Sequence, residues 1–166
     1  ATSGQFVLDL DGQLRIAAEG VFDNEPPVKI SSFPLEEYDS IAKGVIFYVI
    51  RTGKPVKLDD AANEGIFIYD HYISKNNLKS ILCLPISSHG KLTGVIYLEN
   101  KLTVQAFSDN ITEVLSVILS QIAITLDNSL LYSNLAKITG KLNKEKSELE
   151  EKIQKIEEQT EKRDYL

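Results

Sequence analysis

The chain has 166 residues and a net charge of −6, from 18 basic and 24 acidic side chains. This length suits one domain with an appendage, and the absence of a basic stripe argues against a nucleic-acid partner. The single cysteine, Cys83, excludes an intrachain disulfide and a cysteine-based zinc site. It is compatible with a reducing cytoplasm, where we expect the protein. No uninterrupted apolar run reaches about 18 residues, so we expect no direct membrane insertion.

The first part of the chain predicts three strands. Residues 5–10 and 13–19 read as two strands joined through Asp11–Gly12, a strong turn dipeptide. Pro26–Pro27 breaks the pattern, and residues 28–33 then predict a third strand, short or at a sheet edge.

A helix and a short strand follow. Residues 35–38 predict the beginning of a helix, and from Ser40 apolar residues recur at helical spacing. We expect Ser40 or Asp39 to be the N-cap and Gly53 to end the helix. Residues 56–58 predict a brief extended segment.

The middle of the chain predicts an irregular segment and then a hairpin. Residues 59–79 mix polar loops with aromatic residues, and a long irregular segment in a compact domain is often functional. Two apolar runs, 81–86 and 92–98, flank a turn in which Gly90 can take a positive φ. Neither run alternates between apolar and polar, so we expect this hairpin at the centre of a sheet covered on both faces.

The last part predicts one long helix. It begins near Phe107, with Ser108 or Asn110 as N-cap, and we expect its apolar stripe to pack on the sheet. The stripe consists of Ile111, Val114, Leu115, Ile118, Leu119, Ile122, Ala123 and Leu126.

Beyond residue 134 the helix changes to mixed charges with sparse apolar residues. Leu135, Leu142, Leu149 and Ile156 recur every seven residues, which predicts a weak two-stranded coiled coil and a homodimer. A solvated single helix or a frayed tail is the alternative. The chain contains no Met, so we expect a fragment of a longer protein. We divide it into a domain over residues 1–134 and a helical linker over residues 135–166, leading to an output domain outside this sequence.

Three segments carry a family resemblance. They read YVIRTGKPVKLDDA at 48–61, DHYISKNNLKSILCLPISSHGKLTGVIYLENKLTVQAFS at 70–108, and SQIAITLDNSLLYSNL at 120–135. In this order and spacing they resemble GAF domains, especially the sensor modules of bacterial multi-domain signalling kinases. A PAS domain, with a similar sheet and exit helix, is the alternative fold.

The resemblance implies an α+β fold. Its core is a PAS-related antiparallel sheet of about six strands, with helices on both faces and a long C-terminal signalling helix. A ligand pocket is implied on the face opposite the terminal helices. GAF domains usually begin with a helix that this chain lacks or has truncated, so we expect a partner chain to cover the exposed helix face.

The resemblance also directs attention to Asp70 and His71. His71 is similar to the histidine beside the bilin in phytochrome GAF domains, but Asp70 stands where many of those carry the attachment cysteine. Asp70 cannot form that thioether, so we expect no covalent bilin at this position. The two side chains are candidates to hydrogen-bond a polar ligand, and His71 could titrate near neutral pH. A helix-start Asp and a surface His are the structural alternative.

Four further residues complete the candidate pocket. Tyr48, Phe67 and Tyr72 are aromatic residues that could line it or pack in the core. Cys83 could contact a ligand or sense redox state, although a thiol in an apolar strand is usually inert. One cysteine cannot run the disulfide cycle of GAF-type methionine sulfoxide reductases, and phosphate-loop, GxSxG and HExxH motifs are missing, so we expect no enzyme.

Two functions remain open at this stage. The first is a regulatory sensor that binds an unknown small molecule or a partner and signals through its C-terminal helix to an output such as a kinase. The second is a dimerisation spacer that binds nothing small. The second predicts a sheet face filled by Phe67, Tyr69 and Tyr72, without a cavity of about 300 Å³ or more.

Overall fold

The computed structural model describes residues 1–22 and 25–164, with side chains described as far as residue 156. Two compact units are present, Ala1–Ile124 and Thr125–Leu166. The first contains a sheet and its covering helices, and the second consists of the remainder of the C-terminal helix.

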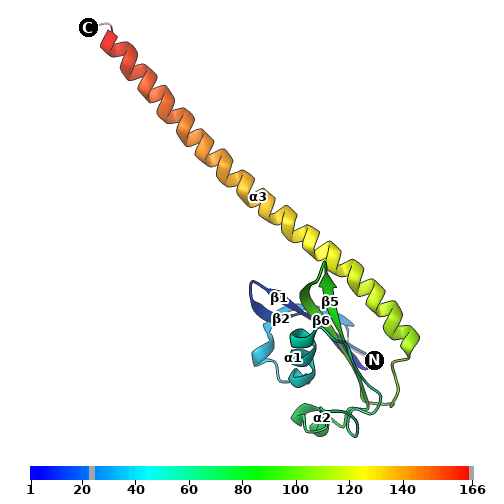
Figure 1. Ribbon diagram of the computed structural model, residues 1–166. Helices are drawn as coiled ribbons and strands as arrows, with labels where there is room; N and C mark the ends of the chain where they lie inside the picture. Colours follow the sequence, from blue (N-terminus) through cyan, green and yellow to red (C-terminus); the bar gives the residue numbers. More distant parts are fainter. Residues whose placement is uncertain (23–24, 165–166) are drawn as a thin grey trace. The chain divides into compact units, whose positions relative to one another are not determined.

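Six antiparallel strands form one sheet in the order β3-β2-β1-β6-β5-β4 (Figure 1). The strands are β1 (Ser3–Leu10), β2 (Gln13–Val21), β3 (Val28–Pro34), β4 (Val56–Leu58), β5 (Ser80–Ser88) and β6 (Lys91–Asn100). The helices are the 3-10 turn η1 (Leu35–Glu37), α1 (Lys43–Thr52), α2 (His71–Asn76) and α3 (Asp109–Asp164). The predicted α+β architecture, with the β5–β6 hairpin inside the sheet and β3 at its edge, is confirmed.

Helices cover both faces of the sheet in the first unit (Figure 1). On the face under α1 and α2, which we call the α1 face, the buried apolar strand residues are Val7, Ile16, Val56, Leu58, Ile81, Cys83, Val95 and Tyr97. On the opposite α3 face they are Leu82, Leu84, Ile86 and Ile96. Both faces of β5 and β6 are therefore buried, as the sequence predicts.

One extra residue in β2 shifts its pairing with β1. Val7 pairs with Ile16 but Phe6 pairs with Ala18, so Ala17 has no residue opposite it. Such a bulge reverses the face to which the following residues point.

α1 begins later than predicted, because neither residue 39 nor residue 40 is its N-cap. Ala42 precedes the helix without a side-chain hydrogen bond, and it is buried in the core with Ile41. Burial of these two residues, rather than a cap, fixes the helix start. The predicted stop is confirmed: Gly53 has a φ of 66° and donates its N–H to the Val49 carbonyl.

α3 begins as predicted, since the Ile111 N–H donates to the Ser108 hydroxyl at 3.3 Å. Only part of its apolar stripe packs on the α3 face, by Leu115, Leu119, Ile122 and Ala123. Ile111, Val114 and Ile118 are exposed. The expectation that the whole stripe packs on the sheet is therefore wrong, because the stripe is wider than the side of the helix that meets the strands.

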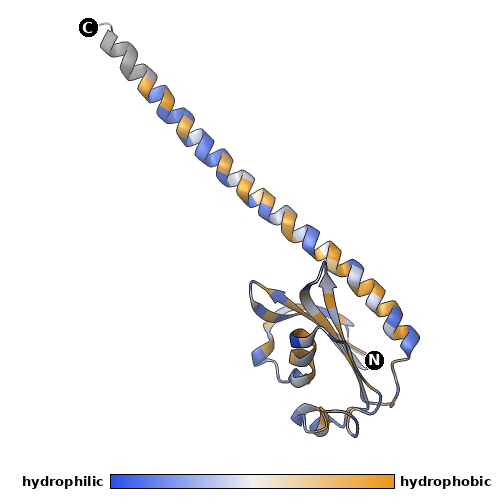
Figure 2. Cartoon of the chain, viewed as in Figure 1, coloured by the Kyte–Doolittle hydropathy of each residue, from blue (hydrophilic) through white to orange (hydrophobic). Residues whose placement is uncertain are grey.

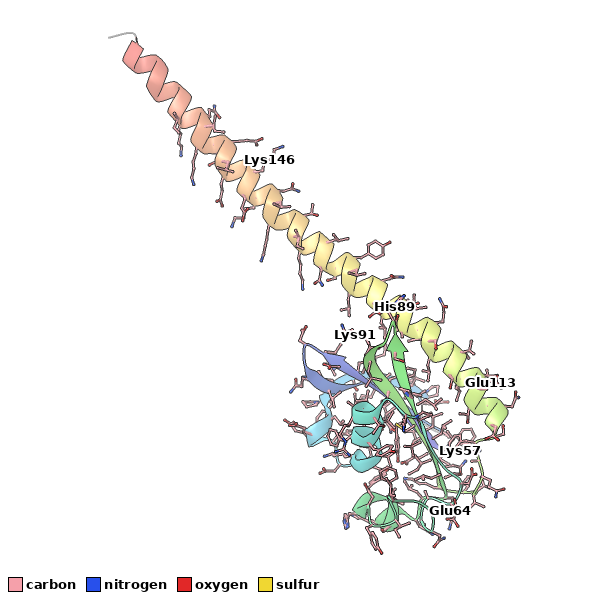
Figure 3. The ribbon with its side chains drawn as sticks, viewed as in Figure 1. Lys57, Glu64, His89, Lys91, Glu113 and Lys146 are labelled. Carbon is pink, nitrogen blue, oxygen red and sulfur yellow. The ribbon has the colours of Figure 1, made fainter. Side chains whose placement is uncertain are left out.

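The second unit is α3 from Thr125 onward. The side chains of Leu135, Leu142, Leu149 and Ile156 are all more than half exposed. Lys146 pairs with Glu150 one turn away at 3.6 Å (Figure 3), and polar residues alternate with apolar ones along the helix (Figure 2). By length and composition alone α3 could cross a membrane, a property that core helices of globular proteins share. Residues 165–166 of the predicted linker lie outside the described residues, as do its side chains from residue 157.

Candidate functional site

Polar side chains gather on the otherwise apolar α1 face. Gln5 pairs with Glu19 on one side and Tyr97 on the other, and in the next row Ser3 pairs with Glu99. The bulge in β2 brings Glu19 to this face, where the Tyr38 hydroxyl contacts it. We define the polar cluster as Gln5, Glu19, Tyr97 and Glu99 of the sheet, with Tyr38 and Tyr72 of the segments packed on it.

Glu99 is the most heavily bonded member of the polar cluster. Its carboxylate is 1% exposed and accepts hydrogen bonds from the hydroxyls of Ser3 at 2.9 Å, Tyr72 at 3.2 Å and Tyr97 at 3.2 Å. Lys101 places its ammonium 3.5 Å from the same carboxylate. These donors and the cation make a buried negative charge tolerable.

The side-chain nitrogen of Gln5 has a hydrogen-bond partner, but among the described residues its side-chain oxygen has none. Tyr38 donates its proton to Glu19 at 2.7 Å, so the Gln5 amide nitrogen serves the Tyr38 oxygen as a donor. Within the described part of the chain, the buried Oε1 of Gln5 accepts no hydrogen bond. Leaving a buried carbonyl oxygen without a donor costs about 1–3 kcal/mol, so this atom needs an explanation.

The tyrosines of the polar cluster are held neutral. Burial, then the neighbouring Glu99, raises the pKa of Tyr97 and of Tyr72. Burial and the hydrogen bond to Glu19 raise the pKa of Tyr38. Each hydroxyl therefore remains a hydrogen-bond donor throughout the physiological range.

Tyr72 is the one predicted site residue that belongs to the polar cluster. Tyr48 on α1 and Phe67 meet edge to face with ring centroids 5.6 Å apart, and both pack against the core of the α1 face. Tyr69, by contrast, is 90% exposed and does not fill the sheet face.

Asp70 and His71 are neighbours in sequence but have different surroundings. The Asp70 carboxylate caps α2, accepting from the backbone N–H of Tyr72 at 2.9 Å and of Ile73 at 3.3 Å. His71 is exposed at the first position of α2. The capping role explains why an Asp stands at this position.

Cys83 lies on β5, opposite Tyr97 on the α1 face. It is fully buried, and burial raises the pKa of its thiol. A thiol in this state is a poor nucleophile. His89, the second histidine, lies at the tip of the β5–β6 hairpin and is exposed (Figure 3).

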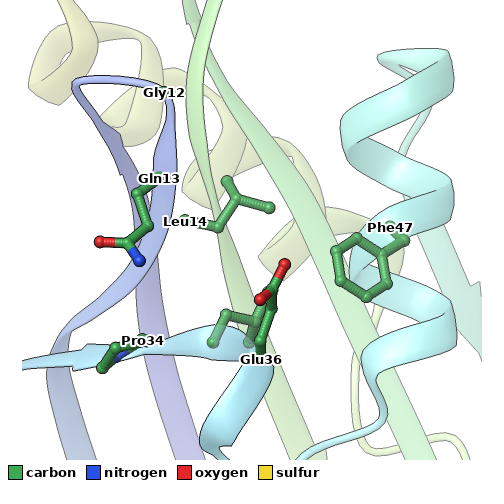
Figure 4. Close-up of a pocket in the computed structure, with 7 residues that line it drawn as sticks. Gly12, Gln13, Leu14, Pro34, Glu36 and Phe47 are labelled. Atoms are coloured by element: carbon green, nitrogen blue, oxygen red, sulfur yellow. The ribbon is translucent and has the colours of Figure 1, made fainter.

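Two hollows lie in the first unit, and the larger of them borders the polar cluster. One of about 130 Å³ is bounded by β2, η1 and α1, with Leu14, Glu36 and Phe47 on its walls (Figure 4). Another of about 350 Å³ is open and mostly apolar, and its lining includes Gln5 and Glu19 together with apolar residues such as Phe6, Ile96 and Leu98. Among the described residues, no group of three or more His, Cys, Asp or Glu side chains could hold a metal ion.

Sequence reasoning missed Gln5, Glu19, Tyr38, Tyr97 and Glu99. Tyr97 and Glu99 stand two apart in β6, and that alternation was the available signal for a shared face. The apolar residues on both sides of β6 obscured it. Glu19 could not be assigned, because the bulge that turns it leaves no mark in the sequence.

The sequence of this chain is similar to one family of domains and to a signalling protein. The family model of the GAF domain matches residues 7–126. A hybrid signal transduction histidine kinase G from Dictyostelium discoideum is 36% identical over 124 residues, which is 74% of this chain but 4% of that protein. The relative therefore comes from a eukaryote rather than from the bacterial kinases that the sequence suggested.

Solved structures show the same fold at low identity. The GAF domain of a two-component sensor histidine kinase from Bacillus halodurans has a TM-score of 0.52 at 20% identity, covering 79% of this chain and 84% of that one. A type II free methionine-R-sulfoxide reductase from Thermoplasma acidophilum has a TM-score of 0.52 at 16% identity, covering 74% and 76%. The fold is thus shared by signalling domains and by an enzyme.

Proposed function

Because the chain belongs to the GAF domain family, we propose that it is a regulatory sensor module of a cytoplasmic signal-transduction protein. A small molecule or partner binds at the α1 face, and α3 passes the change to an output domain such as a kinase. The chain itself is non-catalytic, a proposal supported by the burial and raised pKa of its one thiol. The hybrid histidine kinase relative supports the signalling context.

The observation that carries this proposal is the position of β6 between the candidate site and α3. Tyr97 and Glu99 belong to the polar cluster on the α1 face, whereas Ile96, next to Tyr97 in β6, packs in the same cluster of residues as Leu119 and Ala123 of α3. A shift of β6 caused by a ligand on one face therefore changes the packing of α3 on the other.

Titration calorimetry with nucleotides, haems, bilins and small metabolites tests the input. Hydrogen exchange over residues 109–126, with and without any binder found, tests transmission. We expect a binder that slows exchange in residues 71–76 and alters it in α3. If no member of the panel binds, the proposal that the domain senses a ligand fails. If a ligand binds but hydrogen exchange in α3 is unchanged, the proposal that α3 transmits the signal fails.

A dimerisation spacer without a ligand is the second candidate function. It is favoured by the Tyr72–Glu99 and Tyr48–Phe67 contacts, which fill part of the α1 face with the chain's own side chains. Both candidates include a homodimer through the apolar residues spaced by seven in the second unit. Calorimetry separates the two, since the spacer binds nothing in the panel.

A further inference from the structure

The polar cluster contains more acceptors than its own donors satisfy. The hydroxyls of Ser3, Tyr72 and Tyr97 all go to Glu99, and the Tyr38 hydroxyl goes to Glu19. Across the described residues nothing is left to serve Oε1 of Gln5, although this side chain is only 3% exposed. A buried acceptor without a donor, beside two carboxylates, matches a ligand that brings donors.

The charge of the polar cluster points the same way. It holds the carboxylates of Glu19 and Glu99, and among the described residues the one ammonium that forms an ion pair with them is that of Lys101, on Glu99. No arginine belongs to the cluster, and its phenols are committed as donors. An anionic ligand would therefore meet a negative field without free donors, whereas a cation is attracted.

Access to the buried acceptors is controlled by two tyrosines. Tyr38 and Tyr72 are only partly buried, and they come from the η1 and α2 segments rather than from the sheet. Tyr38 donates to Glu19, which pairs with Gln5, and Tyr72 donates to Glu99 in the next row. Glu19 is already partly exposed, so small rotations of these rings would open Gln5 beside it to solvent, and the ring faces would contribute cation–π attraction to a bound cation.

We propose that Gln5, Glu19 and Glu99 bind the ammonium or amidinium group of a small organic cation between Tyr38 and Tyr72. One N–H of the cation donates to Oε1 of Gln5 and others donate to the carboxylates. This assignment of ligand class rests on the proposed sensor function.

Three small probes of similar size test the assignment: n-butylammonium chloride, 1-butanol and sodium butyrate. Each is titrated at millimolar concentration into the ¹⁵N-labelled chain while amide shifts are followed. We expect n-butylammonium to give saturable shifts at Gln5, Glu19, Tyr97 and Glu99, whereas the alcohol and the anion give none there. Equal shifts from butyrate, or ammonium shifts confined to the charged part of α3, overturn the proposal.

Two substitutions separate binding from folding. Gln5→Met removes the unpartnered oxygen while keeping the side chain's length, and should abolish saturable binding without lowering the melting temperature. Glu19→Gln should weaken binding by about tenfold, as loss of a charged acceptor does. Glu36→Gln, at the hollow of about 130 Å³, is the matched control and should bind as the unmodified chain does. Unchanged binding in Gln5→Met overturns the proposal.

Failure of this inference is distinguishable from failure of the sensor function. If an anionic or neutral member of the calorimetry panel binds and shifts the Tyr72 amide while n-butylammonium does not, the ligand class is wrong and the sensor stands. If neither the cation nor any panel member binds, both proposals fall.

Discussion

The Tyr72 hydroxyl on α2 donates to Oε1 of Glu99 on β6 across 3.2 Å, joining residues 27 positions apart in the sequence. This bond ties the segment over the α1 face to a buried carboxylate beneath it. Tyr72→Phe should lower the free energy of unfolding by about 1 kcal/mol, because Glu99 keeps its other donors. It should also speed hydrogen exchange in residues 71–76. The exposed Tyr69 provides a control, since Tyr69→Phe should change neither quantity; unaltered exchange in α2 of Tyr72→Phe would contradict the role given to this bond.

The cap of α2 makes a separate prediction. Asp70→Ala removes the acceptor of two backbone N–H groups and should cost about 1 kcal/mol, measured by urea unfolding. Asp70→Asn keeps a capping oxygen and should retain most of that stability. If the Asn variant folds normally but loses a ligand that the unmodified chain binds, Asp70 contacts the ligand as well as capping the helix. Equal losses of stability in Asp70→Ala and Asp70→Asn would show that the negative charge of Asp70, and not its capping oxygen, stabilises the start of α2.

Alkaline pH should destabilise the fold. Burial raises the pKa of the Cys83 thiol, and burial with Glu99 raises that of Tyr97, from ordinary values of 9.0 and 10.0. Above these values the unfolded chain has released protons that the folded chain still holds. Stability therefore declines as pH rises through 9 and then 10, by up to about 1.4 kcal/mol per pH unit for each group.

Guanidinium unfolding at a series of pH values from about 7 to 10.5 measures this decline. Cys83→Ala should shift stability by a constant amount but remove the part of the slope that begins at pH 9. A wild-type chain whose stability rises over this range would be inconsistent with buried, protonated groups.

Two glycines in strands should respond differently to alanine. A Cβ at Gly94 on β6 would overlap the Val7 carbonyl oxygen and approach the Leu8 Cα to 3.0 Å. Gly94→Ala should therefore lose at least about 2 kcal/mol, because backbone must move. At Gly20 the nearest atom would be the Pro27 oxygen at 3.5 Å, an ordinary contact, so Gly20→Ala should cost much less. Comparable losses of stability in the two variants, measured by thermal unfolding, would contradict the close pairing of β1 with β6 at Gly94.

The exposed apolar residues of the second unit predict a dimer. Leu142 and Leu149 are each 58% exposed, and association of two helices would bury them. The double change Leu142→Asp with Leu149→Asp should convert a dimer into a monomer in light scattering. Ser147→Asp adds charge outside this seven-residue spacing and should leave the mass unchanged. A monomeric unmodified chain at high concentration would contradict the dimer.

Strand and helix positions could be predicted wherever local signals agree with the fold. Asp11–Gly12 and Gly90 located the hairpin turns, and Ser108 located the start of α3. The start of α1 could not be predicted, because burial of Ile41 and Ala42 decides it and burial depends on the whole core. Side-chain spacing alone also could not show which part of the α3 stripe meets the sheet.

The candidate site was less predictable than the fold. Tyr72, Tyr48 and Phe67 were recognised by their chemistry, and the structure brings them to the α1 face. Gln5 and Glu99 were not, because their importance depends on segments that are distant in sequence: Glu99 accepts hydrogen bonds from Ser3 and Tyr72, and among the described residues Oε1 of Gln5 is buried without a donor. Whether these residues meet a ligand is what the n-butylammonium titration decides.

The unpaired Ala17 has a consequence for how such domains could diversify. If β2 ran straight with all its residues kept, Ala18 would lie opposite Gln5 and Glu19 would turn to the other face of the sheet. Deleting Ala17, by contrast, would restore a regular ladder and leave Glu19 opposite Gln5. The acidic wall of the site therefore depends on strand register as well as on side-chain identity, and a slip by one residue would exchange a carboxylate for a methyl group without any substitution.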